Sequence, residues 1–275
     1  FLSFMSEEKT NESSIVEEAK KKVKIYSHSK LWLYEHCPEA YKIKYIDKKF
    51  PELPKSIEAF LGDIVHQSLD WFYTELLKVN IVSLDDFIHQ FIQYWKRNFS
   101  EELRINSSFN ENHYFNKGIK FLVDYYEKNK PFPDNTIATE KEFFFDLDEK
   151  GEYKIRGFID RIVLNKKENE YEVHDYKTND WLKSQEEIDA DGQLAFYHLG
   201  INDLFGKQEK VKLVWHFLAH NRKMESRRTQ QELKHLKEET FILIKKIEST
   251  VSWPACGKKW CDWCEYKRRN GLGNW

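Results

Sequence analysis

The chain has 275 residues and a formal net charge of −2, with 33% charged and 16% aromatic residues. This length suffices for one large domain or two small ones with an ample core. The near-neutral balance argues against a wholly basic nucleic-acid binder, so any affinity for DNA must come from local patches. The mean hydropathy of −0.74 and the lack of an 18-residue apolar run predict no membrane span.

Residues 1–24 are polar and charged without a sustained apolar stripe, which predicts a flexible tail. A helix is expected from about Tyr26, with Ser27 or Ser29 as its N-cap. Cys37-Pro38 should divide this segment into two short helices, because proline is unfavourable inside a helix. A connector follows at 50–56. Apolar residues at helical spacing then predict three amphipathic helices, over 57–77, 84–99 and 112–128.

From Thr136 the pattern changes to alternating apolar and polar residues, which predicts strands separated by hairpin turns. A capping box at Thr229-Gln-Gln-Glu232 predicts a late helix, to about Ile247. The order predicts an α/β sheet edged by helices in one domain over 25–275, with a helical region (25–130), a core (131–220) and a C-terminal segment (221–275). The expected core strands cover 136–147, 153–164, 170–177 and 212–219, and one helix covers 185–199.

The strand Tyr171-Glu-Val-His-Asp-Tyr-Lys-Thr178 carries an acid and a lysine two residues apart. Side chains two apart on a strand share a face, so Asp175 and Lys177 should project side by side. Such a pair can bind a metal and the water or phosphate beside it. The Asp-x-Lys pattern alone is a weak signal, and its surroundings must support it.

Asp160 lies within an apolar strand, where an unpaired carboxylate is unfavourable. A salt bridge to Arg161 is an alternative to a metal, although alternation sends Arg161 to the opposite face. His66 follows Gly62 by four residues on the 57–77 helix and could be an ordinary buried histidine. If His66, Asp160 and Asp175 converge, the two carboxylates repel by roughly 4 kcal/mol at 4 Å and a dielectric near 20.

A divalent cation would neutralise such a cluster. Carboxylate oxygens favour Mg²⁺ or Mn²⁺, and an imidazole ligand tilts the choice toward Mn²⁺. Lys177 could then orient a nucleophile and stabilise the charge that develops on a phosphate. The combination predicts phosphodiester hydrolysis.

The motifs together resemble the RecB-type branch of the PD-(D/E)XK nuclease superfamily, from about Tyr26 to Tyr266. The likeness is greatest to the iron–sulfur exonucleases of CRISPR adaptation and AddB-like recombination nucleases. The matching motifs are Cys37-Pro38, Gly62-x-x-x-His66, Gly157-x-x-Asp160, Asp175-Tyr-Lys-Thr178 and Gln193-x-x-x-Tyr197.

The resemblance implies a restriction-endonuclease-like core with a mixed central sheet and a role for each site residue. His66, Asp160, Asp175 and the main-chain carbonyl of Tyr176 would bind the cation, and Lys177 would be the catalytic lysine. The family's first-strand glutamate falls at Glu140 or, less well, at Glu142. Gln193 and Tyr197 would position DNA or the lysine, with ordinary helix packing as the alternative.

The chain has four cysteines: Cys37, Cys256, Cys261 and Cys264. Three of them cluster near the C-terminus, which favours a metal over disulfides in an intracellular chain. No secretory signal is recognisable, and we expect a cytoplasmic, reducing location. Four thiolates suit a [4Fe–4S] cluster or a tetrahedral Zn²⁺, and the resemblance favours iron–sulfur.

This chain departs from the usual family pattern, because Cys256 precedes the Cys261-x-x-Cys264 pair and no cysteine follows it. Joining Cys37 to the C-terminal cysteines would staple the two chain ends, a structural role. Nearby basic residues could hold phosphates or form a solvated face. They are Lys258, Lys259, Lys267, Arg268 and Arg269.

The main prediction is a Mg²⁺- or Mn²⁺-dependent DNA exonuclease with a structural iron–sulfur cluster. It would act on DNA ends, mainly of single strands, in repair, recombination or CRISPR-type processing, with repair or CRISPR-adaptation proteins as candidate partners. Two alternatives stay open. One is a non-catalytic module that holds DNA ends within a larger complex, and the other is a zinc-stabilised endonuclease.

Overall fold

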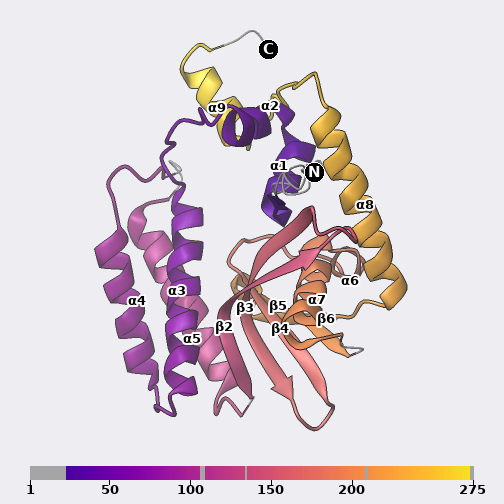
Figure 1. The fold of residues 1–275 in the computed structure, drawn as a ribbon. Coiled ribbons are helices and arrows are strands. Elements are labelled where there is room, and N and C mark those ends of the chain that lie inside the picture. Colours follow the sequence, from indigo (N-terminus) through magenta and orange to yellow (C-terminus); the bar gives the residue numbers. More distant parts are fainter. Residues whose placement is uncertain (1–22, 106–108, 134, 208–209, 273–275) are drawn as a thin grey trace, which may run out of the picture.

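The computed structural model describes residues 23–105, 109–133, 135–207 and 210–272, so nearly all of the expected tail over 1–24 lies outside the described residues. A twisted sheet forms the middle of the molecule, with one group of helices on each side and the cysteine segment above it (Figure 1). None of the described helices combines the length and apolarity needed to cross a bilayer.

The central sheet is mixed and six-stranded, in the order β1-β3-β4-β5-β6, with β2 also paired to β3. The β1–β3 and β4–β5 pairs are parallel, and the other pairs are antiparallel. The strands predicted over 136–147, 153–164 and 170–177 are confirmed, whereas β1 and β6 were not predicted. The strands are β1 (Lys24–Tyr26), β2 (Thr136–Asp146), β3 (Tyr153–Asn165), β4 (Glu170–Lys177), β5 (Val211–Phe217) and β6 (Arg222–Ser226).

One face of the sheet is covered by α3 (Ile57–Leu77), α4 (Leu84–Asn98) and α5 (Glu111–Asn129), which confirm the three amphipathic predictions. Each begins at a polar cap: Ser56, Ser83 and Asn110 accept bonds from the first-turn amides. Their apolar sides pack together in one core that includes Phe72, Phe87 and Leu122. These three helices therefore form a layer of their own.

The other face carries α6 (Gln185–Asp189), α7 (Gly192–Phe205) and α8 (Gln230–Ser249). The single helix expected over 185–199 is wrong, because Asp191 starts a new helix by accepting the Leu194 amide at 3.0 Å. Gln193 and Tyr197 nevertheless share α7. The Thr229–Glu232 capping box of α8 is confirmed.

The sheet and α7 approach closely around the ring of Phe143. A Cβ added at Gly157 on β3 would lie 2.4 Å from that ring, and one at Gly200 on α7 would lie 2.5 Å from it. The two glycines therefore allow the ring to fill the space between sheet and helix.

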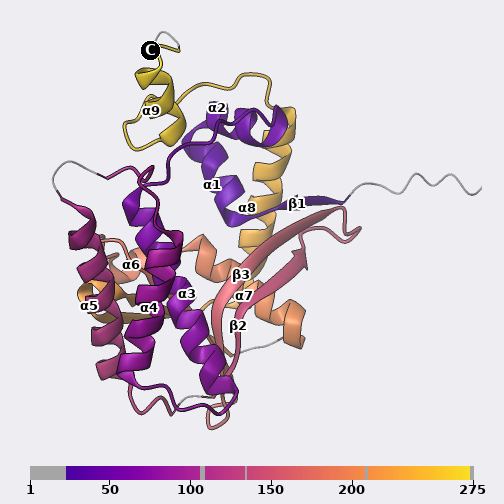
Figure 2. The same ribbon diagram turned by 90° about the vertical axis from the view of Figure 1, so that its left-hand side faces the viewer.

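The cysteine segment joins the two ends of the described chain. The predicted break at Cys37 is confirmed, since α1 (His28–His36) ends there and α2 (Pro38–Tyr41) begins, followed by a π-helical turn, η1 (Lys42–Ile46). Ser27 is the N-cap of α1. The unpredicted α9 (Asp262–Arg269) lies beside α2 in both views (Figures 1 and 2), and the Trp263 indole donates to Glu39 at 2.7 Å.

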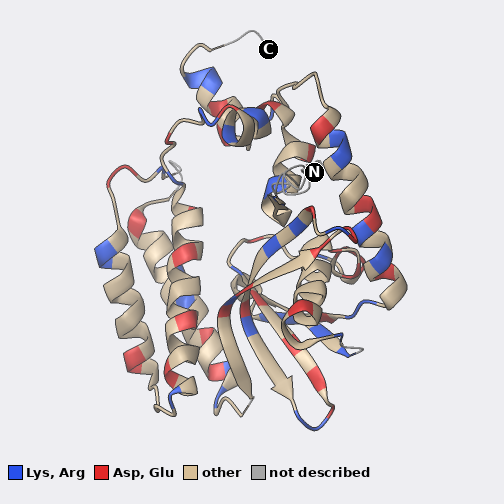
Figure 3. Cartoon of the chain, in the orientation of Figure 1, with Lys and Arg blue, Asp and Glu red and all other residues tan. Residues whose placement is uncertain are grey.

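The end of the core differs from the expected strand over 212–219. β5 stops at Phe217, and a short 3₁₀-helix, η2 (Leu218–His220), turns the chain into β6. Acidic and basic residues are interspersed along α8 (Figure 3). In α9 the acids lie in the first turn and the bases in the last turn, at Lys267, Arg268 and Arg269.

Candidate active site

β3 and β4 separate at Asp160 and Asp175, the two acids of the predicted site. The strands pair from Asn165–Glu170 to Arg161–His174. Asp160 and Asp175 lie just beyond the last pair, one on each arm of the resulting fork. β4 continues to pair with β5 through Lys177, so the acid and lysine keep a regular strand behind them.

Three ligand-type side chains converge at this fork from three elements. His66 of α3, Glu140 of β2 and Asp160 of β3 each bring one ligand atom within 4.8 Å of the other two. His66 Nδ1 lies 3.4 Å from Asp160 Oδ2. A cavity of about 480 Å³, lined by His66, Glu140 and residues of α3, opens beside them. A small cation with bound water can therefore reach the cluster.

The structure separates the two candidate glutamates. Thr139 pairs with Arg161 and Lys141 with Ile159, which puts Glu140 opposite Asp160. Glu140 has a φ of +43°, an unfavourable conformation for a residue other than glycine and one that often marks functional sites. The Glu142 side chain instead forms a salt bridge with Arg156.

The imidazole of His66 is held in one orientation. Nε2–H donates to the main-chain carbonyl of Tyr176 at 2.8 Å, so Nδ1 faces the Asp160 carboxylate. The lone pair of a neutral Nδ1 would repel the carboxylate oxygen that it faces. A proton on Nδ1, or a cation between the two atoms, removes this repulsion. Burial lowers the pKa of His66, but Asp160 and Asp175 more than compensate and raise that pKa to about 9. The site thus favours a positive charge at this point.

The acids of the site respond differently to their surroundings. Burial and the neighbouring Asp160 carboxylate raise the pKa of Glu140 to about 7. Burial also raises the pKa of Asp175, against the opposing effect of Lys177. For Asp160, burial is outweighed by His66 and Lys177, so its pKa is lowered. Crowded carboxylates that cannot all ionise without a counter-charge are typical of a cation site.

Asp175 and Lys177 form a neighbouring unit tied to α7. Lys177 Nζ lies 2.7 Å from Asp175 Oδ2 and donates to Gln193 Oε1 at 3.2 Å. The Tyr197 hydroxyl donates to Asp175 Oδ1 at 3.0 Å. Asp175 is outside the group formed by His66, Glu140 and Asp160, since these contacts turn its carboxylate toward the lysine.

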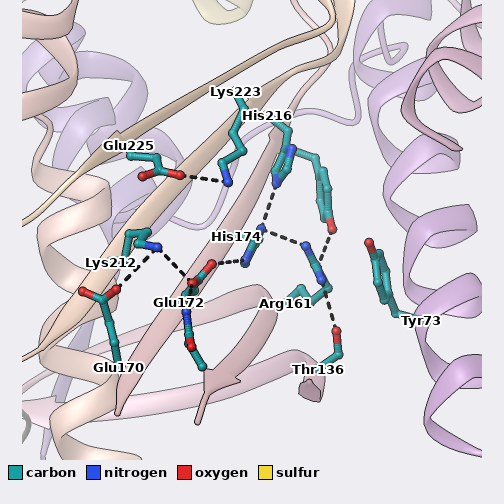
Figure 4. A network of polar contacts seen from close by, with 12 residues as sticks. Tyr73, Thr136, Arg161, Glu170, Glu172, His174, Lys212, His216, Lys223 and Glu225 are labelled. Atoms are coloured by element: carbon teal, nitrogen blue, oxygen red, sulfur yellow. Dashed lines mark hydrogen bonds and ion pairs between the residues drawn. The ribbon is translucent and has the colours of Figure 1, made fainter. Parts of the chain in front are cut away.

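Tyr176 connects the cluster to the opposite side of β4. Its main-chain N–H donates to Asp160 Oδ2 at 3.0 Å, while its hydroxyl accepts a bond from Arg161 Nε at 2.9 Å. The Arg161 guanidinium lies 4.0 Å from the centre of the Tyr73 ring. Arg161 therefore reaches into a buried network on the other face (Figure 4), as strand alternation predicts.

This network continues along the sheet (Figure 4). His174 Nδ1 accepts a bond from Arg161 at 2.8 Å and lies 2.8 Å from His216 Nε2. Its other nitrogen faces Glu172 at 3.5 Å, and Lys212 binds Glu172 at 3.0 Å. The contact with His174, followed by that with Lys212, holds the pKa of Glu172 well below its usual range. The sequence analysis did not predict this network. The feature that could have indicated it is the presence of charged residues within β4, a strand that is largely buried.

The four cysteines meet at the join between the chain ends. Their sulfur atoms all lie within 4.8 Å of one another, with Cys256 Sγ 3.6 Å and Cys37 Sγ 3.8 Å from Cys264 Sγ. All four are free thiols. A hydrogen bond from Cys261 lowers the pKa of Cys37 to about 5. The donor set and spacing can hold a metal, and the predicted link between Cys37 and the C-terminal cysteines is present.

Fold and site together define a nuclease-type hydrolase. A mixed sheet flanked by helices presents acids and a lysine at forked strands. The family model of the PD-(D/E)XK nuclease superfamily matches residues 25–269, and the chain belongs to that superfamily.

One solved structure supports this fold over nearly the whole chain. A candidate exonuclease from Eubacterium rectale aligns with a TM-score of 0.53 at 14% identity, covering 96% of this chain and 94% of that chain. At this identity the likeness shows the fold alone. The structure of SSO0001 aligns at 20% identity over 78% of this chain and 83% of that one, but its TM-score of 0.31 is too low to carry an argument. No curated protein shows a significant match.

Proposed function

We propose that this chain is a divalent-metal-dependent deoxyribonuclease that hydrolyses phosphodiester bonds from DNA ends. The observation that carries the proposal is the convergence of His66, Glu140 and Asp160 beside the Asp175–Lys177 pair. The name of the E. rectale neighbour supports exonuclease rather than endonuclease activity. A role in repair, recombination or CRISPR-type processing stays a prediction from the sequence resemblance.

The residues fit a Mg²⁺ or Mn²⁺ ion. His66, Glu140 and Asp160 would hold it, with Asp175 and the Tyr176 carbonyl beside them. When bound, such an ion makes a water more acidic and neutralises charge on the phosphate. Burial lowers the pKa of Lys177, but Asp175 and Asp160 outweigh burial and raise it above its ordinary value. The ammonium therefore stays protonated at neutral pH and stabilises charge rather than accepting a proton.

The test is hydrolysis of end-labelled linear DNA with Mn²⁺. Asp160→Ala and Lys177→Ala should each lower the rate by about 10²–10³-fold. Lys154→Ala, which removes a half-buried lysine of the same sheet that pairs with Asp146, should not. Closed circular DNA should resist cutting if the enzyme needs an end. Full activity in both site variants would contradict the assignment, and DNA binding without cutting in any divalent cation would favour an end-binding module.

For the four cysteines we infer a single tetrahedral ion such as Zn²⁺. A Zn–S bond of about 2.3 Å implies sulfur atoms about 3.8 Å apart at the corners of a tetrahedron. The sulfurs of Cys256 and Cys37 lie 3.6 and 3.8 Å from that of Cys264. In a [4Fe–4S] cluster each thiolate binds a different iron, so the sulfurs must stand further apart than around one ion.

Metal analysis of protein purified without oxygen decides between the two. The inference expects a colourless protein with about one zinc per chain, and loss of zinc and of folding in Cys264→Ser. A brown protein containing iron and acid-labile sulfide would support the iron–sulfur prediction instead.

A further inference from the structure

A short loop over 178–184 connects the active site to α6. It follows Lys177, the last residue of β4. The first residue of the loop lies against the cation cavity, because a Cβ added at Gly62 would be 3.2 Å from Thr178 Oγ1 and Gly62 lines that cavity with His66. The loop therefore begins at the rim of the site.

Two groups of contacts hold the loop, one on each side of its middle. The Asp180 carboxylate accepts two bonds from Lys117 of α5, both at 2.7 Å, and His220 Nε2 lies 2.9 Å from the Asp180 carbonyl oxygen. Lys183 donates at 2.5 Å to Asp191, the N-cap of α7. The loop is thus fixed to a helix of each layer.

The far end of the loop returns to the catalytic lysine. The ammonium groups of Lys177 and Lys183 lie 4.8 and 4.3 Å from the centre of one ring, that of Trp215. Trp181 comes between these two lysines in the sequence. At no more than about 3.6 Å per residue, its backbone lies within about 7 Å of Lys183 and about 14 Å of Lys177. The middle of the loop therefore stays close to the active site.

Trp181 is the most exposed tryptophan in the described part of the chain, at 66%. The next residue, Leu182, packs against the main core, so the loop is held down while the indole stays in solvent. A single exposed apolar residue needs no explanation by itself. Here, however, the ring stands on an anchored loop beside a nuclease site. This position favours contact with the substrate.

We propose that Trp181 stacks on the terminal base of DNA and so makes the enzyme depend on an end. Within a strand, each base has a neighbour on both faces, whereas the last base has one free face. An indole can cover this face in any sequence, because every base has a π-face. A single strand and a blunt duplex both offer such a face, so Trp181 recognises the end and not the number of strands. This inference rests on the proposed nuclease function and names the residue behind its end requirement.

The loop geometry also predicts short products. The backbones of Trp181 and Lys177 are at most about 14 Å apart, and each DNA strand advances about 3.4 Å per nucleotide. The held end is therefore about four nucleotide steps or fewer from the phosphate that Lys177 faces. Wild-type digestion of end-labelled DNA should release oligonucleotides of a few residues or mononucleotides. Labelled products that are all much longer would contradict this placement.

Stacking can be measured without cutting, on the full chain with neither added Mn²⁺ nor chelator, so that the cysteine site is undisturbed. Three oligonucleotides carry 2-aminopurine at the 5′ end, at the 3′ end or in the middle. The wild type should quench the probe at one end far more than in the middle. Trp181→Ala should abolish this quenching and weaken binding about tenfold, since one stacked base contributes about 1–3 kcal/mol. Trp181→Phe, which keeps a ring, should retain most of both.

Trp32→Ala is the matched control, because Trp32 is 42% exposed and stacks on His36 of α1 instead. It should bind DNA as the wild type does, and thermal unfolding checks that every variant is folded. A duplex closed by hairpins at both ends has no free terminal base. It should bind more weakly than an open duplex of the same sequence, and Trp181→Ala should abolish this difference.

With Mn²⁺, Trp181→Ala should raise KM for linear DNA about tenfold and leave kcat nearly unchanged, because stacking is the same before and during the reaction. Equal binding by Trp181→Ala and Trp32→Ala would overturn the inference, as would an equal loss on open and closed duplexes. A protein that shows the expected stacking but cuts no DNA with any divalent cation would contradict the proposed function alone. Cutting that depends on Asp160, with unchanged KM in Trp181→Ala, would contradict the role of Trp181 alone.

Discussion

The imidazole of His66 donates to the main-chain carbonyl of Tyr176 at 2.8 Å, which ties α3 to β4. The N–H of Tyr176 donates in turn to Asp160. One residue of β4 thus fixes two of the three converging ligands. On the other face of the sheet, Arg161 donates to the Tyr176 hydroxyl and so fixes the position of Tyr176.

Arg161 is therefore predicted to position the site without touching it. Arg161→Met should lower the free energy of unfolding by about 2 kcal/mol, because the buried acceptors lose a charged donor. It should also weaken Mn²⁺ binding about tenfold, as changes behind metal ligands commonly do. Denaturant unfolding and a Mn²⁺ titration followed by EPR measure the two effects. Lower stability with unchanged Mn²⁺ affinity would mean that the network is only structural.

Gln193 is expected to keep Lys177 in place. Gln193→Leu removes the acceptor of the ammonium and should lower kcat on DNA about tenfold, within the range that misplaced catalytic groups produce. Gln185→Leu on α6 is the control, since Gln185 contacts Asp189 and the Glu225 carbonyl instead. If both variants cut DNA equally fast, Gln193 serves only helix packing.

Phe143 is predicted to make both neighbouring glycines indispensable. Gly157→Ala and Gly200→Ala should each destabilise by about 1–3 kcal/mol through overpacking against the ring. Adding Phe143→Leu should recover part of the loss, and chemical unfolding would show this. Gly192→Ala is the control, because its nearest contact would be at 3.9 Å. Wild-type stability of the two alanine variants would refute the packing account.

The Glu172 carboxylate is expected to stabilise the fold in a pH-dependent way. His174 and then Lys212 depress its folded pKa, so its contribution is complete above the unfolded value of about 4.3 and is lost as the pH falls through the folded pKa. Glu172→Gln should cost about 2 kcal/mol at pH 7, and this difference should shrink below about pH 4. Exposed Glu168→Gln should show neither effect, and a pH-independent difference for Glu172→Gln would contradict the ion pairing.

Much of the fold was predictable from the sequence, because its long helices and strands have a strong periodicity of apolar residues. Helices over 57–77, 84–98 and 111–129 repeat apolar residues over several turns, and the three core strands alternate between clear turns. β1 and β6 are too short for a pattern to emerge. The break before α7 depends on the cap that Asp191 forms by accepting the Leu194 amide.

The candidate site was predictable in its parts but not in its geometry. Spacing placed Asp160 and Arg161 on opposite faces, and Asp175 beside Lys177. It could not choose between Glu140 and Glu142, since residues two apart share a face. The choice follows from the left-handed backbone at Glu140 and from the pairing of Glu142 with Arg156, both of which depend on three-dimensional packing.

These two glutamates provide the most direct test of the account. Mn²⁺-dependent cleavage of linear DNA should be measured for Glu140→Gln and Glu142→Gln over a range of Mn²⁺ concentrations. The account predicts that Glu140→Gln loses at least about 10²-fold in rate and needs more Mn²⁺, while Glu142→Gln resembles the wild type. Equal activity of the two variants, or a greater loss in Glu142→Gln, would contradict the convergence of His66, Glu140 and Asp160 on one cation.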